Sequence, residues 1–97
     1  MSAYVINRVN ATQWRWLKEY GAPTRAIIEK HGGCYLAQGG TTEELEGKGE
    51  LPTALVVLEF PDMESAKAWN NDPDYQPLKE LRQANADVEI ALIDGLG

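Results

Sequence analysis

The sequence predicts an α+β fold in which strands and helices follow one another in the order β-α-β-β-α-β. Two punctuated blocks carry this prediction. In residues 31–40 (HGGCYLAQGG) a helix gives way to a strand, and in residues 58–69 (LEFPDMESAKAW) a strand gives way to a helix. The third observation is the nearly continuous apolar run at 53–60 (TALVVLEF), which is typical of a central strand buried on both faces.

The first strand and the first helix are expected in the opening third of the chain. Residues 3–9 are rich in β-branched and aromatic side chains and predict a strand. Thr12 is a candidate helix cap, and apolar residues recur at helical spacing from Trp14 to Ile28. Because proline removes a backbone donor and clashes with the preceding turn, Pro23 predicts a kinked helix or two short helices that meet there.

The glycines that follow predict where this helix ends and the next strands begin. The helix is expected to end at His31, with Gly32 as its left-handed cap. A short strand is predicted at 34–38. Residues 41–46 are expected to form a short extension or hairpin arm, followed by a loop at 47–52.

Proline and aspartate mark the elements of the second half. Pro61 ends the strand 53–60, and Asp62 is a good cap for the helix that follows. Residues 71–74 (NDPD) predict a turn, and Pro77 suits the first turn of another short helix. The last strand is expected at 88–93 (VEIALI).

This order of elements is the ferredoxin-like βαββαβ pattern. Right-handed crossovers then produce a four-stranded antiparallel sheet, with the first and third strands central and the helices on one face. The strands 53–60 and 88–93 carry apolar side chains on both faces, and a large exposed apolar sheet is unfavourable in a monomer. The sequence therefore predicts a homodimer whose sheets pack against each other.

Composition limits the class of protein. The 97 residues, 43% of them apolar, are expected to form one domain over 1–97. The net charge of −6, with scattered basic residues, argues against a nucleic-acid partner. No apolar run approaches the roughly 20 residues that a membrane-spanning helix needs. The lone Cys34, and a start without a charged and apolar leader, favour the cytoplasm.

Six motifs in order and spacing make the chain similar to a bacterial family known as domain of unknown function 1330: residues 4–6, 31–33, 36–40, 58–61, 68–69 and 75–78. The resemblance implies a dimeric α/β barrel, in which two sheets close into one barrel across a twofold axis. Relatives in that wider superfamily include cofactor-free monooxygenases, muconolactone isomerase and stress-responsive barrel proteins. Members of the family commonly carry arginine where this chain has Gln38. Gln38 can still form hydrogen bonds, but it does not offer an anionic ligand the permanent positive charge of arginine.

His31 and Glu59 are the candidate catalytic residues. Histidine changes charge near neutral pH, which suits proton transfer, but His31 also lies where a helix C-terminus favours a cation. Glu59 lies in the most apolar strand, and a buried carboxylate there is either part of a site or paired with a cation such as Arg8. A single histidine and a single cysteine are too few for structural zinc, so no metal is predicted.

Gln38, Trp69, Tyr75 and Arg8 are the candidate residues of a ligand pocket. For Trp69 and Tyr75 a role as core anchors is favoured over a place in the pocket wall, and Tyr4, Tyr20 and Trp14 are weaker candidates for the same wall.

Three functions remain open. The first is an enzyme without a cofactor, isomerase- or monooxygenase-like, that acts on a small organic molecule with Glu59 or His31 as base. The second is a non-catalytic dimer that binds or senses a small ligand. The third is a structural dimer with a filled core.

Overall fold

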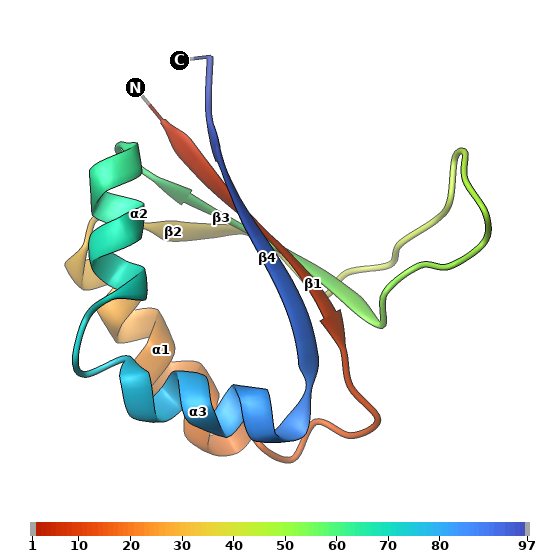
Figure 1. The fold of residues 1–97 in the computed structure, drawn as a ribbon, viewed down its shortest axis with the longest axis horizontal. Helices are drawn as coiled ribbons and strands as arrows, with labels where there is room; N and C mark the ends of the chain where they lie inside the picture. Colours follow the sequence, from red (N-terminus) through yellow and green to blue (C-terminus); the bar gives the residue numbers. More distant parts are fainter. Residues whose placement is uncertain (1, 97) are drawn as a thin grey trace.

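The computed structural model describes residues 2–96, in which four strands form one sheet and three helices cover one of its faces (Figure 1). The strands are β1 (Ala3–Asn10), β2 (Cys34–Gln38), β3 (Ala54–Phe60) and β4 (Asp87–Asp94), and the helices are α1 (Leu17–Lys30), α2 (Met63–Asn70) and α3 (Gln76–Asn85). The strand order is β2-β3-β1-β4, and neighbouring strands are antiparallel. The predicted ferredoxin-like fold, with the first and third strands central, is confirmed. Within one chain the sheet is open and is not closed into a barrel.

The register of the strands assigns each side chain to one of the two sheet faces. Val5 lies opposite Leu58 on β3 and opposite Leu92 on β4, and this set faces the helices. Tyr4 lies opposite Glu59 and Ile93, on the face that no helix covers. Because side chains alternate along a strand, the odd-numbered residues of β1 line the helical side and the even-numbered ones the open side.

A cluster of aromatic and aliphatic side chains forms the core between the sheet and α2. The Trp69 ring lies between the rings of Phe60 and Tyr75, with centroids 5.4 and 4.9 Å away. Trp69 is 3% exposed and Tyr75 is fully buried. This cluster gives both residues the anchoring role that the sequence allowed.

The end of α1 follows the predicted capping. Gly32 has a φ of +80°, and the Gly33 N–H donates to the Ile28 carbonyl at 2.9 Å. A Cβ at Gly33 would lie 2.5 Å from the Phe60 ring, so only glycine lets the chain pass this close to β3. The glycine pair therefore both ends the helix and fixes its approach to the sheet.

The predicted start of α1 is wrong. The helix begins at Leu17 and not after Thr12, because Gln13 holds the preceding residues in a turn. The Gln13 side-chain oxygen accepts from the Arg15 N–H at 2.8 Å, and its amide nitrogen donates to Asn85 Oδ1 at 3.0 Å. The segment before α1 is thereby tied to the far end of α3.

Pro23 does not divide α1, which runs continuously from Leu17 to Lys30. The proline is exposed. Water can therefore satisfy the backbone carbonyl that loses its helical donor, which lowers the cost of a proline inside the helix.

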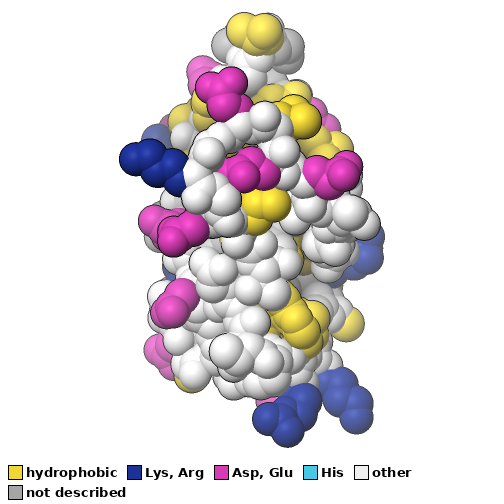
Figure 2. All heavy atoms as spheres, turned by 90° about the vertical axis from the view of Figure 1, so that its right-hand side faces the viewer, with side chains coloured by type: hydrophobic (Ala, Val, Ile, Leu, Met, Phe, Trp, Pro, Cys, Tyr) yellow, Lys and Arg dark blue, Asp and Glu magenta, His cyan; other side chains and the backbone are white. Residues whose placement is uncertain are grey.

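The segment 39–53, between β2 and β3, contains no strand and projects from the body as an arm (Figure 1). Within it the Gly49 N–H donates to a carboxylate oxygen of Glu44, and Leu45 is fully exposed. Figure 2 views the molecule from this side and shows acidic side chains spread over the surface, with apolar side chains between them. No helix within residues 2–96 combines the length and the apolar character needed to cross a membrane.

Candidate functional site

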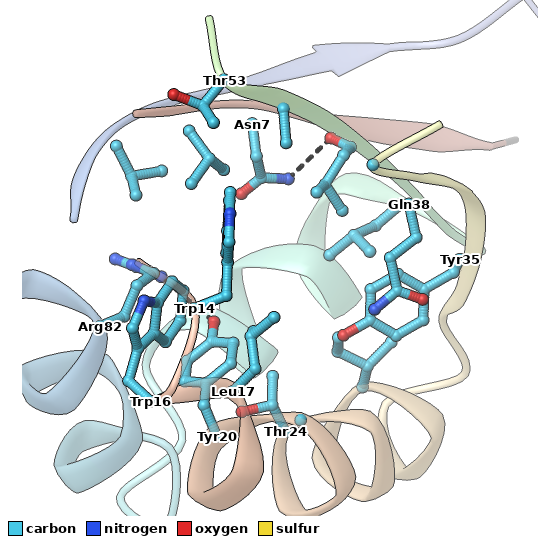
Figure 3. Close-up of a pocket in the computed structure, with 18 of the residues that line it drawn as sticks. Asn7, Trp14, Trp16, Leu17, Tyr20, Thr24, Tyr35, Gln38, Thr53 and Arg82 are labelled. Carbon is cyan, nitrogen blue, oxygen red and sulfur yellow. Dashed lines mark hydrogen bonds between the residues drawn. The ribbon is translucent and has the colours of Figure 1, made fainter. Parts of the chain in front are cut away.

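A cavity of about 370 Å³ lies between the helical face of the sheet and helices α1 and α3 (Figure 3). Its volume falls in the range of about 300–1,000 Å³ that small-molecule sites occupy. Apolar and aromatic side chains make up most of its wall, including Trp14, Trp16, Tyr20, Tyr35 and Trp69. The cavity is therefore suited to a mostly apolar molecule.

The turn that Gln13 holds in place builds one side of this wall. The Trp14 and Trp16 rings stack with centroids 5.8 Å apart, and the Trp16 ring meets Tyr20 edge-on at 5.3 Å. The Trp16 indole N–H donates to the Gln13 carbonyl at 3.0 Å, which fixes the orientation of that ring. Trp16 is buried, whereas Trp14 is 39% exposed and lies across the middle of the view between Asn7 and Leu17 (Figure 3). Trp14 is thus the aromatic residue placed between the cavity and solvent.

Two phenols and a guanidinium form a hydrogen-bonded group on the helical side of the cavity. The Tyr20 and Tyr75 hydroxyls lie 2.7 Å apart, and Arg82 Nη1 donates to the Tyr75 oxygen at 2.7 Å. Burial, followed by the neighbouring Tyr20, raises the pKa of Tyr75 well above its ordinary value. Tyr75 is therefore a neutral phenol that accepts from Arg82.

Arg82 is the charged residue of the cavity wall, and it has no carboxylate partner among residues 2–96. It is 7% exposed. Lys79 lies nearby, and burial together with the Arg82 charge lowers the pKa of Lys79. The Lys79 ammonium donates to the Asn70 carbonyl at 2.8 Å, which is a neutral acceptor. This end of the cavity therefore carries a positive charge that the described part of the chain does not neutralise.

Other polar groups are spread around the wall. Asn7 projects from β1, and its amide nitrogen donates to the Val56 carbonyl at 3.0 Å (Figure 3). Gln38 and Tyr35 lie together at the β2 side of the cavity. Burial raises the pKa of Tyr35 to about 12, so its phenol stays neutral at physiological pH.

The structure brings only part of the predicted site together. Gln38 and Trp69 line the cavity. Tyr75 does not line the cavity, but its hydroxyl is hydrogen-bonded to that of Tyr20, which does. Arg8 is on the opposite face of the sheet, so its predicted place in the pocket is wrong: it has an even position on β1, where side chains point away from the helices.

Glu59 also lies on the open face, opposite Tyr4 and Cys34, and does not line the cavity. It is not paired with Arg8. Arg8 lies opposite Leu55, four residues before Glu59 on β3, and its ion pair at 3.9 Å is with Glu89 on β4. The strand register, which the sequence leaves open, separates these two charges.

His31 belongs to a separate cluster at the end of α1. Its Nε2 lies 2.7 Å from Asp72 Oδ2, and the Lys30 ammonium donates to the same oxygen at 2.9 Å. The Asp74 N–H donates to the other carboxylate oxygen. Hydrogen bonds from His31 and then Lys30 hold the pKa of Asp72 well below its usual range. The cluster ties α1 to the turn before α3 and does not touch the cavity.

Arg82 is a candidate site residue that sequence reasoning missed. It follows Leu78, which packs against the core, by four positions, so helical spacing places both residues on the same side of α3. A charge on an inner face was the available signal. Among residues 2–96 no group of three histidine, cysteine, aspartate or glutamate side chains is arranged to hold a metal ion.

Solved structures show which fold this geometry belongs to. The RPA0582 protein of unknown function from Rhodopseudomonas palustris has a TM-score of 0.78 at 20% identity, over 99% of this chain and 83% of that one. SnoaB from Streptomyces nogalater, described as a cofactor-independent oxygenase, has a TM-score of 0.66 at 14% identity, over 99% and 94% of the two chains. A dimeric ferredoxin-like protein of unknown function from Jannaschia sp. CCS1 has a TM-score of 0.62 at 13% identity, over 98% and 100%.

These likenesses are below 25% identity and bear on the fold alone. No protein with curated annotation is significantly similar to the chain. The sequence profile of Domain of unknown function (DUF1330) matches residues 2–96, which is nearly the whole chain. The protein belongs to the DUF1330 family.

Proposed function

We propose that the protein binds a small, flat organic molecule in the cavity between the sheet and helices α1 and α3. The observation that carries this proposal is the cavity itself, a hollow of about 370 Å³ with a largely apolar and aromatic lining. Concave sites of about this size, mostly apolar with a few polar groups, are the form that small-molecule binding sites usually take. The rings of Trp14, Trp16 and Tyr20 provide flat apolar walls that suit a ring system.

The binding unit in this proposal is a homodimer with one cavity in each subunit. Tyr4, Ile6, Leu55 and Val57 lie on the sheet face that no helix covers, and Ile93 on the same face is 58% exposed. Packing two such faces together would remove this apolar surface from water and close the two open sheets into one barrel. The Jannaschia neighbour, which shares the fold, is described as dimeric.

A cytoplasmic location is part of the same proposal. Cys34 is a free thiol, and it is exposed in the single chain. It lies opposite Glu59, on the sheet face that the dimer would bury. A free thiol of this kind is compatible with a reducing compartment.

Catalysis without a cofactor is the second candidate, in the form of an isomerisation or an oxygenation. Arg82 favours it, because a preorganised hydrogen-bond donor in a cavity wall can stabilise an oxyanion. SnoaB, which has the same fold, is described as a cofactor-independent oxygenase. The described cavity wall includes neither a carboxylate nor an imidazole, which are common general bases, and Glu59 and His31 have no part in the proposal. For this reason binding is placed before catalysis.

A ligand screen with a blocked cavity tests the proposal. The purified protein is screened by thermal shift against small aromatic acids, amides, phenols and alcohols. A ligand present at 100 times its Kd stabilises the folded state by about 2.7 kcal/mol. The hits are then titrated against tryptophan fluorescence, because Trp14 and Trp16 line the cavity.

Gly21 provides the blocked variant and its control. This residue lines the cavity on α1, and a Cβ added there meets nothing within 4 Å. Gly21→Phe should fill the space and abolish binding, whereas Gly21→Ala should bind as the unaltered protein does. Equal binding by both variants would place the ligand elsewhere and refute the proposal. Product formation or oxygen uptake with a bound hit would establish catalysis.

A further inference from the structure

Three buried polar atoms lack a hydrogen-bond partner in the described chain, and all three belong to residues that line the cavity. They are Thr24 Oγ1, Trp69 Nε1 and Arg82 Nε. Leaving a buried polar group unsatisfied costs about 1–3 kcal/mol, and native proteins contain few such groups. Because all three lie at one cavity, we expect a molecule bound there to supply the hydrogen-bond partners that the chain lacks.

The chemistry of these atoms defines what is missing. An arginine Nε–H and an indole N–H can only donate, whereas a threonine hydroxyl can donate or accept. The wall around Arg82 and Trp69 therefore has an excess of donors. Both nitrogens are enclosed in this structure although their residues line the cavity, so a ligand reaches them only when neighbouring side chains move. The complementary ligand carries acceptor oxygens.

The charge of Arg82 adds the second requirement. Its Nη1 is used by the Tyr75 hydroxyl, and neither Nε nor Nη2 makes a hydrogen bond to another described residue. Removing a cation from water without a counterion costs several kcal/mol. Elsewhere the fold pairs its buried charge: Asp72, which is 3% exposed at its side chain, contacts Lys30 and His31. Arg82 is the exception, and it faces an otherwise uncharged wall.

We propose that the ligand is a flat organic acid whose carboxylate binds the Arg82 guanidinium while its apolar ring lies against the aromatic wall. The edge formed by Nε and Nη2 presents two parallel donors, which match the two oxygens of a carboxylate. The bond from Nη1 to Tyr75, itself held by Tyr20, fixes the orientation of that edge. The inference rests on the proposed ligand-binding function and names the class of ligand.

A pair of probes with the same shape and different charge tests this inference. The dissociation constants of 2-naphthoate and 2-naphthamide are measured with the unaltered protein by calorimetry and by tryptophan fluorescence. We expect the acid to bind at least 10-fold more tightly than the amide. The ratio of the two dissociation constants is measured on the unaltered protein, so it tests the proposal whether or not a variant folds.

Variants then locate the preference. Arg82→Met should reduce the ratio to about one by weakening the acid alone, and Arg82→Lys should keep part of it because the charge remains without the planar fork. Arg15→Met is the matched control: this arginine is exposed and does not line the cavity, so the ratio should not change.

The outcomes separate this inference from the function on which it rests. Equal binding of acid and amide by the unaltered protein overturns the acid preference and leaves the binding function intact. Binding of neither probe overturns the acid preference, and binding of no compound in the wider screen overturns the function as well. A preference that survives Arg82→Met unchanged overturns the assignment to Arg82.

Discussion

Replacing Arg82 with methionine should leave the unliganded protein as stable as before or make it more stable. Arg82 is 7% exposed, and its charge has no carboxylate within the described chain. Methionine has no charge and its unbranched side chain reaches about as far as arginine Nε, so it keeps the apolar contacts of the arginine stem and removes the cost of burying a cation. Most substitutions of buried residues destabilise, which makes the expected sign informative.

Two opposing contributions set the magnitude. The variant loses the bond from Arg82 Nη1 to the Tyr75 hydroxyl, and a hydrogen bond to a charged group contributes about 1.5–3 kcal/mol. The variant no longer bears the desolvation penalty of the cation, which is several kcal/mol for a buried ion, and this makes the folded state more stable. The Tyr75 hydroxyl keeps its partner, because Tyr20 lies 2.7 Å away. The free energy of unfolding should therefore rise by about 0–3 kcal/mol, and each kcal/mol raises Tm by about 4–8 °C in a domain of this size.

Urea denaturation, followed by circular dichroism, measures this difference. Lys30→Met is the control with the opposite expectation: Lys30 donates to Asp72 at 2.9 Å, so its removal takes away a partner of a buried carboxylate and should destabilise. A loss of more than about 1 kcal/mol in Arg82→Met would show that the guanidinium holds the fold together. That result would refute the argument that Arg82 destabilises the unliganded protein and serves to bind a ligand.

Three further predictions concern the core, the salt-bridge cluster and the open sheet face. Trp69→Ala should lower the free energy of unfolding by about 3–5 kcal/mol, since it removes the ring packed between Phe60 and Tyr75; a loss below about 1 kcal/mol in urea denaturation would contradict this packing. Asp72→Asn should abolish part of the acid dependence of stability. Because the pKa of Asp72 is lowered in the folded state, the stability that its carboxylate contributes is present above the unfolded-state pKa of about 4 and is lost as the pH falls through the lower folded-state pKa. Plots of unfolding free energy against pH for the variant and the unaltered protein should therefore converge at low pH. Parallel plots would refute this. Val57→Lys, on the uncovered sheet face, should convert a dimer of twice 10.7 kDa into a monomer in light scattering, and a 10.7 kDa mass for the unaltered protein would contradict the dimer.

Local signals in the sequence were sufficient for the order of the elements. Gly32 ends α1 in the left-handed conformation that was expected, because only the residue type and the preceding helix are needed to predict such a cap. The apolar run of β3 likewise predicts a central strand, and Trp69, a candidate core anchor, is buried. The motifs that resemble DUF1330 extend over the chain, and the family profile confirms that resemblance.

What only the tertiary structure decided depends on contacts between residues far apart in the sequence. The start of α1 is set by Gln13 and Asn85, which are 72 positions apart. The faces of Glu59 and Arg8 follow from strand register, and a shift of one residue would reverse them. Only the tertiary structure shows that Arg82 is buried beside Tyr75 and has no carboxylate partner in the described chain. Helical spacing could place Arg82 on a buried face, but whether a buried charge has a partner is a property of three-dimensional neighbours, and that property defines the candidate site.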